Sequence, residues 1–251
     1  MQFTSYGITD PGCVRSENQD RIVFDDSLGL YVVCDGMGGR RRGELAAELA
    51  STAIQQYVES SRDPKEVTWP YGFSLQMSFA ANRLLTSTKL ANRQVWRRSE
   101  EAIEYLGMGT TITAVLVDNS SAAITNIGDS RVYLWRAGKL EQLSVDDSVN
   151  SAPTSAFPAD VARQAMLRSV LTRAAGSQEN AEVHLKECGL EDGDRLLLSS
   201  DGLHGVVGDE RMASILAGAG SAEAAATALI AAARESGAPD NVSAVVVECR
   251  L

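Results

Sequence analysis

Histidine is nearly absent from this chain, whose 251 residues include only His184 and His204. Zinc sites in proteins are built mainly from histidine and cysteine ligands. The four cysteines are scattered and include no CxxC pair: Cys13, Cys34, Cys188 and Cys249. A zinc site built on several histidines is therefore excluded. Cysteines so dispersed are most simply the reduced thiols of a cytoplasmic protein.

The chain also lacks a long apolar run and an excess of positive charge. Its late stretch "AEAAATALIAAARE" contains glutamates and is rich in alanine, so it predicts a helix packed on a core rather than a membrane span. The N-terminus "MQFTSYGITDPG" has neither the basic start nor the apolar segment of a secretory signal. The net charge is −10, and the one basic cluster, Arg40–Arg42, is short. We therefore expect no nucleic-acid partner and no membrane insertion.

Apolar residues at helical spacing predict four helices. Between Gly43 and Val58, the apolar positions recur every four residues and form one helical face. A second helical stretch is expected from about Tyr71 towards Arg97, with a stripe that starts at Leu75. Two more helices are expected late in the chain, at Glu210–Leu216 and Ala222–Glu235.

Short apolar and alternating runs predict strands before, between and after these helices. The turn at Ser27–Gly29 predicts a hairpin, and "TITAVLVD", "SAAITNIGD" and "RVYLWRAG" predict a meander joined at "NSS" and "GDS". Strands come in groups rather than in strict alternation with helices, which favours an α+β fold of antiparallel sheets with helices outside over a doubly wound parallel sheet. With no internal repeat or clear linker, we interpret residues 1–251 as one domain.

Several strand ends carry an aspartate, often next to glycine. Asp35 ends the run "LYVVCDGMGG", Asp129 and Asp201 follow two other apolar runs, and Asp20 and Asp240 each stand just before a strand. A single Asp-Gly after a strand is typical of a turn. The repetition favours a different interpretation, because the ends of strands in one sheet lie near each other.

Carboxylates that converge in this way repel each other, and their pKa values rise unless a cation lies between them. Hard divalent ions prefer oxygen ligands, and glycine allows a backbone carbonyl to approach an ion closely. Because histidines and paired thiolates are missing, the pattern favours Mg²⁺ or Mn²⁺ over zinc. Asp35 and Gly36 are then candidate ligands at the end of a rigid strand.

At this point the sequence resembles a known family, the bacterial branch of the PP2C (PPM) metal-dependent protein serine/threonine phosphatases. The similar motifs occur in the order of the family and span nearly the whole chain. They are "RSENQD", "VVCDGMGG", "GTT", "IGDSRVYL", "SVLTRAAG", "LLLSSDGL" and "PDNVSAVVV". The resemblance implies a layered β-sandwich of two mainly antiparallel sheets flanked by helices (α-β-β-α), with a metal centre at one edge.

The resemblance also implies roles for individual residues. Asp35 would bridge two Mn²⁺ or Mg²⁺ ions, with the Gly36 carbonyl on one ion and Asp201 and Asp240 on the other. Asp20 would act on metal-bound water or lie close to it. Asp129, with Asp201, would hold a third and weaker ion. Arg15 would grip the substrate phosphate with its planar fork.

The implied reaction is the hydrolysis of phosphoserine and phosphothreonine in proteins by a metal-activated water. The implied partners are phosphorylated proteins and a cognate Ser/Thr kinase or its substrates. We expect a cytoplasmic monomer. The loop Ser144–Asp160 is rich in Ser, Ala, Pro and Asp. It matches the flap of the family in location but not in sequence, so the resemblance does not indicate a substrate preference.

Two further departures from the family pattern affect the site. Met37 stands where eukaryotic members often have a histidine that is a candidate general acid, so we hypothesise that metal-bound water protonates the leaving group. Gln19 stands where those members carry an acidic residue, which predicts a weaker outer contact to one ion.

Three other functions were weighed against this one. A dinucleotide-binding loop needs a glycine at the position of Arg41, and "GDSRV" lacks the final glycine of a serine-hydrolase elbow. The remaining alternative is a catalytically silent phosphoprotein-binding module on the same scaffold. Such a module should have lost metal-site aspartates, whereas Asp35, Asp129, Asp201 and Asp240 are all present.

Overall fold

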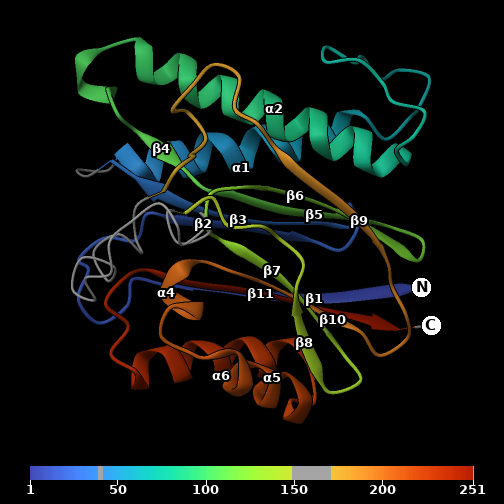
Figure 1. The fold of residues 1–251 in the computed structure, drawn as a ribbon, viewed down its shortest axis with the longest axis vertical. Coiled ribbons are helices and arrows are strands. Elements are labelled where there is room, and N and C mark those ends of the chain that lie inside the picture. The colour runs from blue at the N-terminus through green and yellow to red at the C-terminus, as the bar shows by residue number, and fades with distance from the viewer. Residues whose placement is uncertain (39–41, 149–170, 251) are drawn as a thin grey trace, which may run out of the picture.

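The fold is a sandwich of four layers, seen edge-on in Figure 1. The structure, a computed structural model, describes residues 1–38, 42–148 and 171–250. Two antiparallel sheets pack face to face, and helices cover the outer face of each. This arrangement confirms the predicted α-β-β-α sandwich.

The first sheet joins strands from both ends of the chain. Its order is β1 (Gln2–Asp10), β11 (Val242–Arg250), β10 (Arg195–Ser199), β7 (Arg131–Arg136) and β8 (Lys139–Gln142). The second sheet has the order β2 (Asp20–Asp25), β3 (Leu30–Met37), β5 (Ile112–Asp118), β6 (Ser121–Ile127) and β9 (His184–Gly189), with the short β4 (Gly109–Thr110) paired to β3.

Two pairs of long helices form the outer layers. Over the second sheet lie α1 (Arg42–Ser60) and α2 (Phe79–Glu100), followed by a short 3-10 helix, η1 (Ile103–Tyr105). Over the first sheet lie α5 (Asp209–Gly218) and α6 (Ala222–Glu235), next to the single turn α4 (Asp201–His204). The predictions of helices near 43–58, 210–216 and 222–235 are therefore confirmed.

Apolar side chains fill each of the three spaces between the layers. The space between the sheets is filled by inward-facing residues of both, such as Tyr31, Val115 and Leu198, all with no exposed surface. Alternate residues of the same strands face the helices, because successive side chains of a strand point to opposite sides. Both sheets are thus rigidly held on their two faces, which fixes the positions of their strand ends.

The prediction of a helix from Tyr71 was wrong at its start. The helix begins at Phe79, where Ser78 caps it by accepting a hydrogen bond from the Ala81 N–H at 3.0 Å. Upstream, the Asn82 side chain donates to the carbonyls of Ser74 and Ser78 and holds that segment in turns. Leu75, placed on the helical stripe by its spacing, is 94% exposed.

The predicted meander was also wrong at its second joint. The hairpin at Ser27–Gly29 and the pairing of β5 with β6 are confirmed, but at "GDS" the chain leaves the second sheet, and β7 pairs with β10 and β8 in the first. Gly128 makes this change of sheet with φ of 101°, in the left-handed region that favours glycine. The joint carries Asp129 to the edge between the two sheets.

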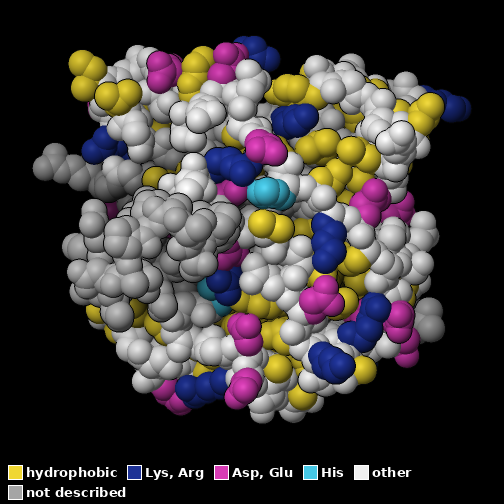
Figure 2. All heavy atoms as spheres, in the orientation of Figure 1, with side chains coloured by type: hydrophobic (Ala, Val, Ile, Leu, Met, Phe, Trp, Pro, Cys, Tyr) yellow, Lys and Arg dark blue, Asp and Glu magenta, His cyan; other side chains and the backbone are white. Residues whose placement is uncertain are grey.

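The surface carries charges of both signs. On the face shown in Figure 2, acidic and basic side chains are interspersed and form no continuous basic area. All four cysteines are free thiols. In the part of the chain that the structure describes, no helix combines the length and the apolar character that a membrane span needs.

Candidate metal centre

Strand ends from both sheets meet at one edge of the sandwich, beside α4 in Figure 1. Asp20 and Asp35 face each other across β2 and β3, Asp201 opens α4 directly after β10, and Asp240 precedes β11. A cavity of about 650 Å³ opens there. It is lined by six of the seven predicted site residues: Arg15, Asp35, Gly36, Asp129, Asp201 and Asp240.

The backbone of Asp35 is clamped by two threonines of the "GTT" motif. The Asp35 N–H donates to Thr111 Oγ1 at 2.9 Å, and the Asp35 carbonyl accepts from the Thr111 N–H at 2.8 Å and from Thr110 Oγ1 at 2.9 Å. The carboxylate therefore stands on a backbone that cannot rotate away. The motif is visible in the sequence, but nothing in it indicates that the threonines hold Asp35.

Gly36 packs against the first turn of α1 so closely that no side chain fits. A Cβ added at Gly36 would lie 2.1 Å from the Gly43 carbonyl oxygen and 2.7 Å from that of Gln19. Both contacts are to backbone, which cannot move aside without shifting α1 or the loop before β2. The residue next to Asp35 must be glycine for this reason alone, whatever its carbonyl binds.

Asp20, the seventh predicted residue, lies beneath the cavity and has no exposed surface. Its Oδ2 accepts hydrogen bonds from Ser200 Oγ at 2.8 Å and from Ser243 Oγ at 2.6 Å. Its Oδ1 is buried and has no hydrogen-bond partner. The two serines stand in "LLLSSDGL" and "PDNVSAVVV", yet nothing in their spacing identifies them as partners of a residue near the N-terminus.

The carboxyl groups of the cavity are costly to ionise together. Burial and then the charges of the neighbouring aspartates raise the pKa of Asp35. Burial raises the pKa of Asp20 to about 6, although its two serine hydrogen bonds act in the opposite direction. Burial and Asp201 raise the pKa of Asp129 to about 7, and burial and Asp240 raise that of Asp201. A cation among these groups would remove the repulsion.

These residues fit a divalent cation. Every candidate donor is an oxygen, and Asp20 Oδ1 and Asp201 Oδ1 are buried oxygens without a hydrogen-bond partner. Within residues 1–38, 42–148 and 171–250, no three His, Cys, Asp or Glu side chains already form a ligand set. Carboxylate and carbonyl oxygens are the ligands that Mg²⁺ and Mn²⁺ prefer.

Arg15 lies at the cavity and is held there from two sides. Its Nη2 donates to Asp240 Oδ2 at 2.8 Å. The loop that carries it is pinned by the side chain of Asn241, which accepts from the Gln19 N–H at 2.9 Å and donates to the Glu17 carbonyl at 2.8 Å. The sequence analysis did not identify Asn241.

Asp129 is positioned through its neighbour Gly128. The Gly128 N–H donates to Asp147 Oδ2 at 3.1 Å, and the Gly128 carbonyl accepts from the Asp147 N–H at 2.9 Å. Asp147 is itself buried and bound to His184 Nε2 at 2.9 Å. It belongs to the predicted flap, 144–160, of which residues 149–160 lie outside the described part of the chain.

Neither histidine lines the cavity. His184 is used by Asp147, and His204 is bound to Ser199 Oγ at 3.0 Å through Nδ1. Burial lowers the pKa of His204 to about 3, so this ring is neutral. Met37 lines the cavity at the position discussed above. Among the described residues that line the cavity, none is a histidine that could act as a general acid.

Comparisons with known proteins identify the family of the chain. The family model described as Protein phosphatase 2C matches residues 14–229. The chain is 31% identical over 252 residues to the serine/threonine phosphatase stp of Listeria welshimeri, covering 97% of this chain and 94% of that protein.

Two solved structures are similar over nearly all of their length. The crystal structure of the Mycobacterium tuberculosis serine/threonine phosphatase PstP/Ppp has a TM-score of 0.84 at 29% identity and covers 100% of both chains. The catalytic domain of the phosphatase PstP in complex with two manganese ions has a TM-score of 0.81 at 28% identity and covers 99% of both chains.

Proposed function

This chain belongs to the protein phosphatase 2C family and is a protein serine/threonine phosphatase, and we propose that it works as a metal-dependent hydrolase whose ions bind among the cavity aspartates. We further propose that it acts as a cytoplasmic monomer on phosphoserine and phosphothreonine of proteins, opposing bacterial Ser/Thr kinases. The observation that best supports the metal site is a group of buried and half-buried aspartates with raised pKa values, in which two carboxylate oxygens lack hydrogen-bond partners.

We assign the ion ligands from the resemblance and from the residues that line the cavity. Asp35, the Gly36 carbonyl, Asp201 and Asp240 would hold two ions, with Asp35 contributing to both. Asp129 and Asp201 would hold a third, weaker ion. The PstP catalytic domain, with its two manganese ions, supports Mn²⁺ or Mg²⁺ here. The ions would supply a strongly acidified water as the nucleophile and neutralise charge on the phosphate.

The protein's own side chains bind and orient the reactants. Arg15 has five N–H donors in a planar fork and uses one nitrogen on Asp240, which leaves the rest of the fork for two phosphate oxygens. Asp240 thus orients the group that binds the substrate. Asp20 Oδ1, a buried oxygen without a hydrogen-bond partner, is free to accept a hydrogen bond or a proton, and we propose that a metal-bound water supplies it.

The alternative of a catalytically silent module is disfavoured by the complete set of oxygen donors around the cavity. The experiment that separates the two is hydrolysis of p-nitrophenyl phosphate and of a phosphothreonine peptide by the purified protein. We expect hydrolysis with Mn²⁺, its loss in EDTA and its return when Mn²⁺ is restored. A protein that binds the phosphopeptide in the presence of Mn²⁺ but releases no phosphate would be a binding module instead.

A further inference from the structure

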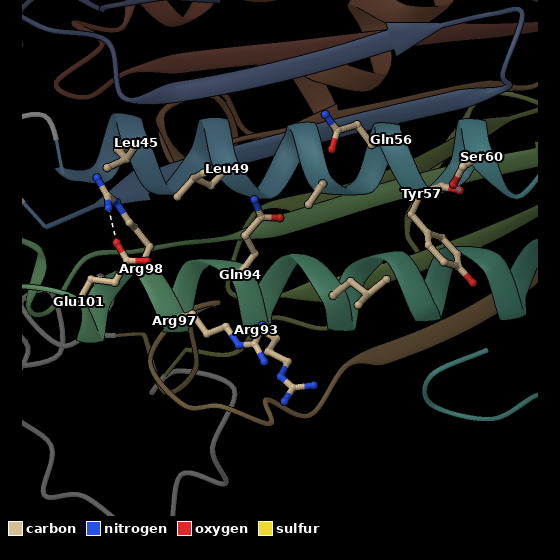
Figure 3. Close-up of a pocket in the computed structure, with 12 residues that line it drawn as sticks. Leu45, Leu49, Gln56, Tyr57, Ser60, Arg93, Gln94, Arg97, Arg98 and Glu101 are labelled. Atoms are coloured by element: carbon tan, nitrogen blue, oxygen red, sulfur yellow. Dashed lines mark hydrogen bonds and ion pairs between the residues drawn. The ribbon is translucent and has the colours of Figure 1, made fainter. Parts of the chain in front are cut away.

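A second cavity lies on the outer face of the helical pair α1 and α2, away from the proposed metal centre. Figure 3 shows this groove, of about 890 Å³, between the two helices. On the α1 side it is lined by Leu45, Leu49, Ala53 and Tyr57, which stand one helical turn apart. At 1.5 Å per residue these positions span about 18 Å, or a little over three turns.

The floor of the groove is apolar. Leu45 and Leu49 of α1 pack against the core from above but are only half-buried, and Leu90 lines the groove from α2. A row of apolar residues at intervals of four along a helix normally faces a packing partner. The sheet covers the opposite face of α1. The apolar residues of α1 that line the groove therefore remain partly exposed to solvent.

The α2 edge of the groove is positively charged. Arg93, Arg97 and Arg98 line it, against one acid, Glu101. Arg98 pairs with Glu101, and Arg93 lies 3.6 Å from Glu179. Arg97 is exposed and has no ion-pair partner in the described parts of the chain. This edge is unusual in a chain with a net charge of −10.

The α1 residues that line the groove carry no charge. Gln56 and Ser60 are neutral, and the Tyr57 hydroxyl, on a ring that reaches towards α2 in Figure 3, donates to the Thr68 carbonyl at 2.8 Å. An occupant would therefore meet cations on one flank, neutral polar groups on the other and an apolar floor between them. A ligand that complements all three has an apolar face with acidic side chains along one flank only.

We propose that this groove docks an amphipathic helix of a partner protein, about three turns long, with its apolar face on the floor and an acidic flank over α2. A helix suits the groove better than an extended segment, because α1 and α2 use their backbone groups internally and offer none to a strand. The acidic flank follows from the exposed Arg97, which stands between two arginines whose acidic partners are already assigned.

A second copy of the chain fits less well as the occupant. In a two-fold dimer the same surface faces itself, so it would have to supply the acidic flank from its own residues. Among the residues that line the groove the one acid is Glu101, and it is already paired with Arg98.

The test uses a designed probe, an 18-residue fluorescein-labelled helix with leucines on one face and glutamates along one flank. Binding is measured by fluorescence anisotropy without substrate or added metal, so the result does not depend on hydrolysis. We expect saturable binding to the protein, although its overall negative charge repels an acidic peptide. Arg97→Glu should weaken binding about tenfold, because one attraction becomes a repulsion.

Matched controls isolate the groove. Lys139→Glu changes the net charge equally at an exposed site on β8, in the other sheet, and should leave the affinity unchanged. A probe with serines in place of the leucines, and one with lysines in place of the glutamates, should lose the binding that depends on Arg97. Circular dichroism and p-nitrophenyl phosphate hydrolysis should be the same for both protein variants.

Three results would overturn the proposal. The first is no saturable binding of the acidic probe. The second is equal affinity for the wild-type protein and Arg97→Glu. The third is self-association of the protein, measured by sedimentation equilibrium, that is lost in Arg97→Glu and would make a second copy the occupant.

Discussion

The variant Asp35→Asn is expected to hydrolyse a phosphoserine peptide about a thousandfold more slowly than the wild-type protein in saturating Mn²⁺. The side chain keeps its shape but loses the charge that is proposed to face both ions. Metal ions contribute several kcal/mol to such transition states, and each 1.36 kcal/mol is a factor of ten in rate. The measurement is kcat from phosphate release, together with the affinity for Mn²⁺ from calorimetry.

The same variant should be more stable than the wild-type protein when no metal is present. Asp35 is half-buried, and desolvation and the neighbouring carboxylates raise its pKa, so removing its charge relieves an unfavourable interaction in the folded state. A drop in activity with a gain in stability separates a metal ligand from a residue that merely supports the fold. Asp118→Asn, at the exposed last residue of β5, is the control and should change neither quantity. A kcat near the wild-type value in Asp35→Asn would show that Asp35 is not a metal ligand.

Metal-free protein is expected to lose stability as the pH rises from about 4 to about 7. The pKa of Asp20 in the folded protein is about 6, against 3.8 for the ordinary group, and that of Asp129 is about 7. Between these values the folded state holds protons that the unfolded chain has already released, so the free energy of unfolding falls with rising pH. For Asp20 alone, a change of about two pKa units corresponds to about 3 kcal/mol.

Divalent metal should reverse this dependence. An ion binds the ionised carboxylates of the folded protein, and its stabilisation increases as protons leave them. The measurement is urea unfolding at several pH values, with EDTA or with Mn²⁺. Parallel curves in the two conditions, with the same pH dependence, would show that no ion reaches these groups.

The layered fold was predictable from local patterns and from the resemblance, because strand and helix periods record which face of each element is buried. The second helix was placed too early because Leu75 extends the apolar stripe by spacing alone. The capping bond from Ser78 and the Asn82 contacts decide the boundary, and neither has a strong pattern. The error at "GDS" arose because a short turn between strands does not say which sheet receives the next one.

Within the site, the sequence indicated the charged residues but not the residues that position them. Asp35 and Asp201 stand beside glycines at the ends of apolar runs, which is a local signal. Ser200 and Ser243 reach Asp20 from positions 180 and 223 residues away in the chain. Such bonds depend on which strands become neighbours, and a single sequence does not contain that information.

The most direct test of the account is anomalous diffraction at the manganese edge from crystals grown with Mn²⁺. We expect two peaks in the cavity, about 3.5–4 Å apart, with Asp35 between them and Asp201 and Asp240 beside one. Crystals that contain manganese elsewhere, or carboxylates that remain in the cavity with no ion among them, would contradict the proposed metal centre.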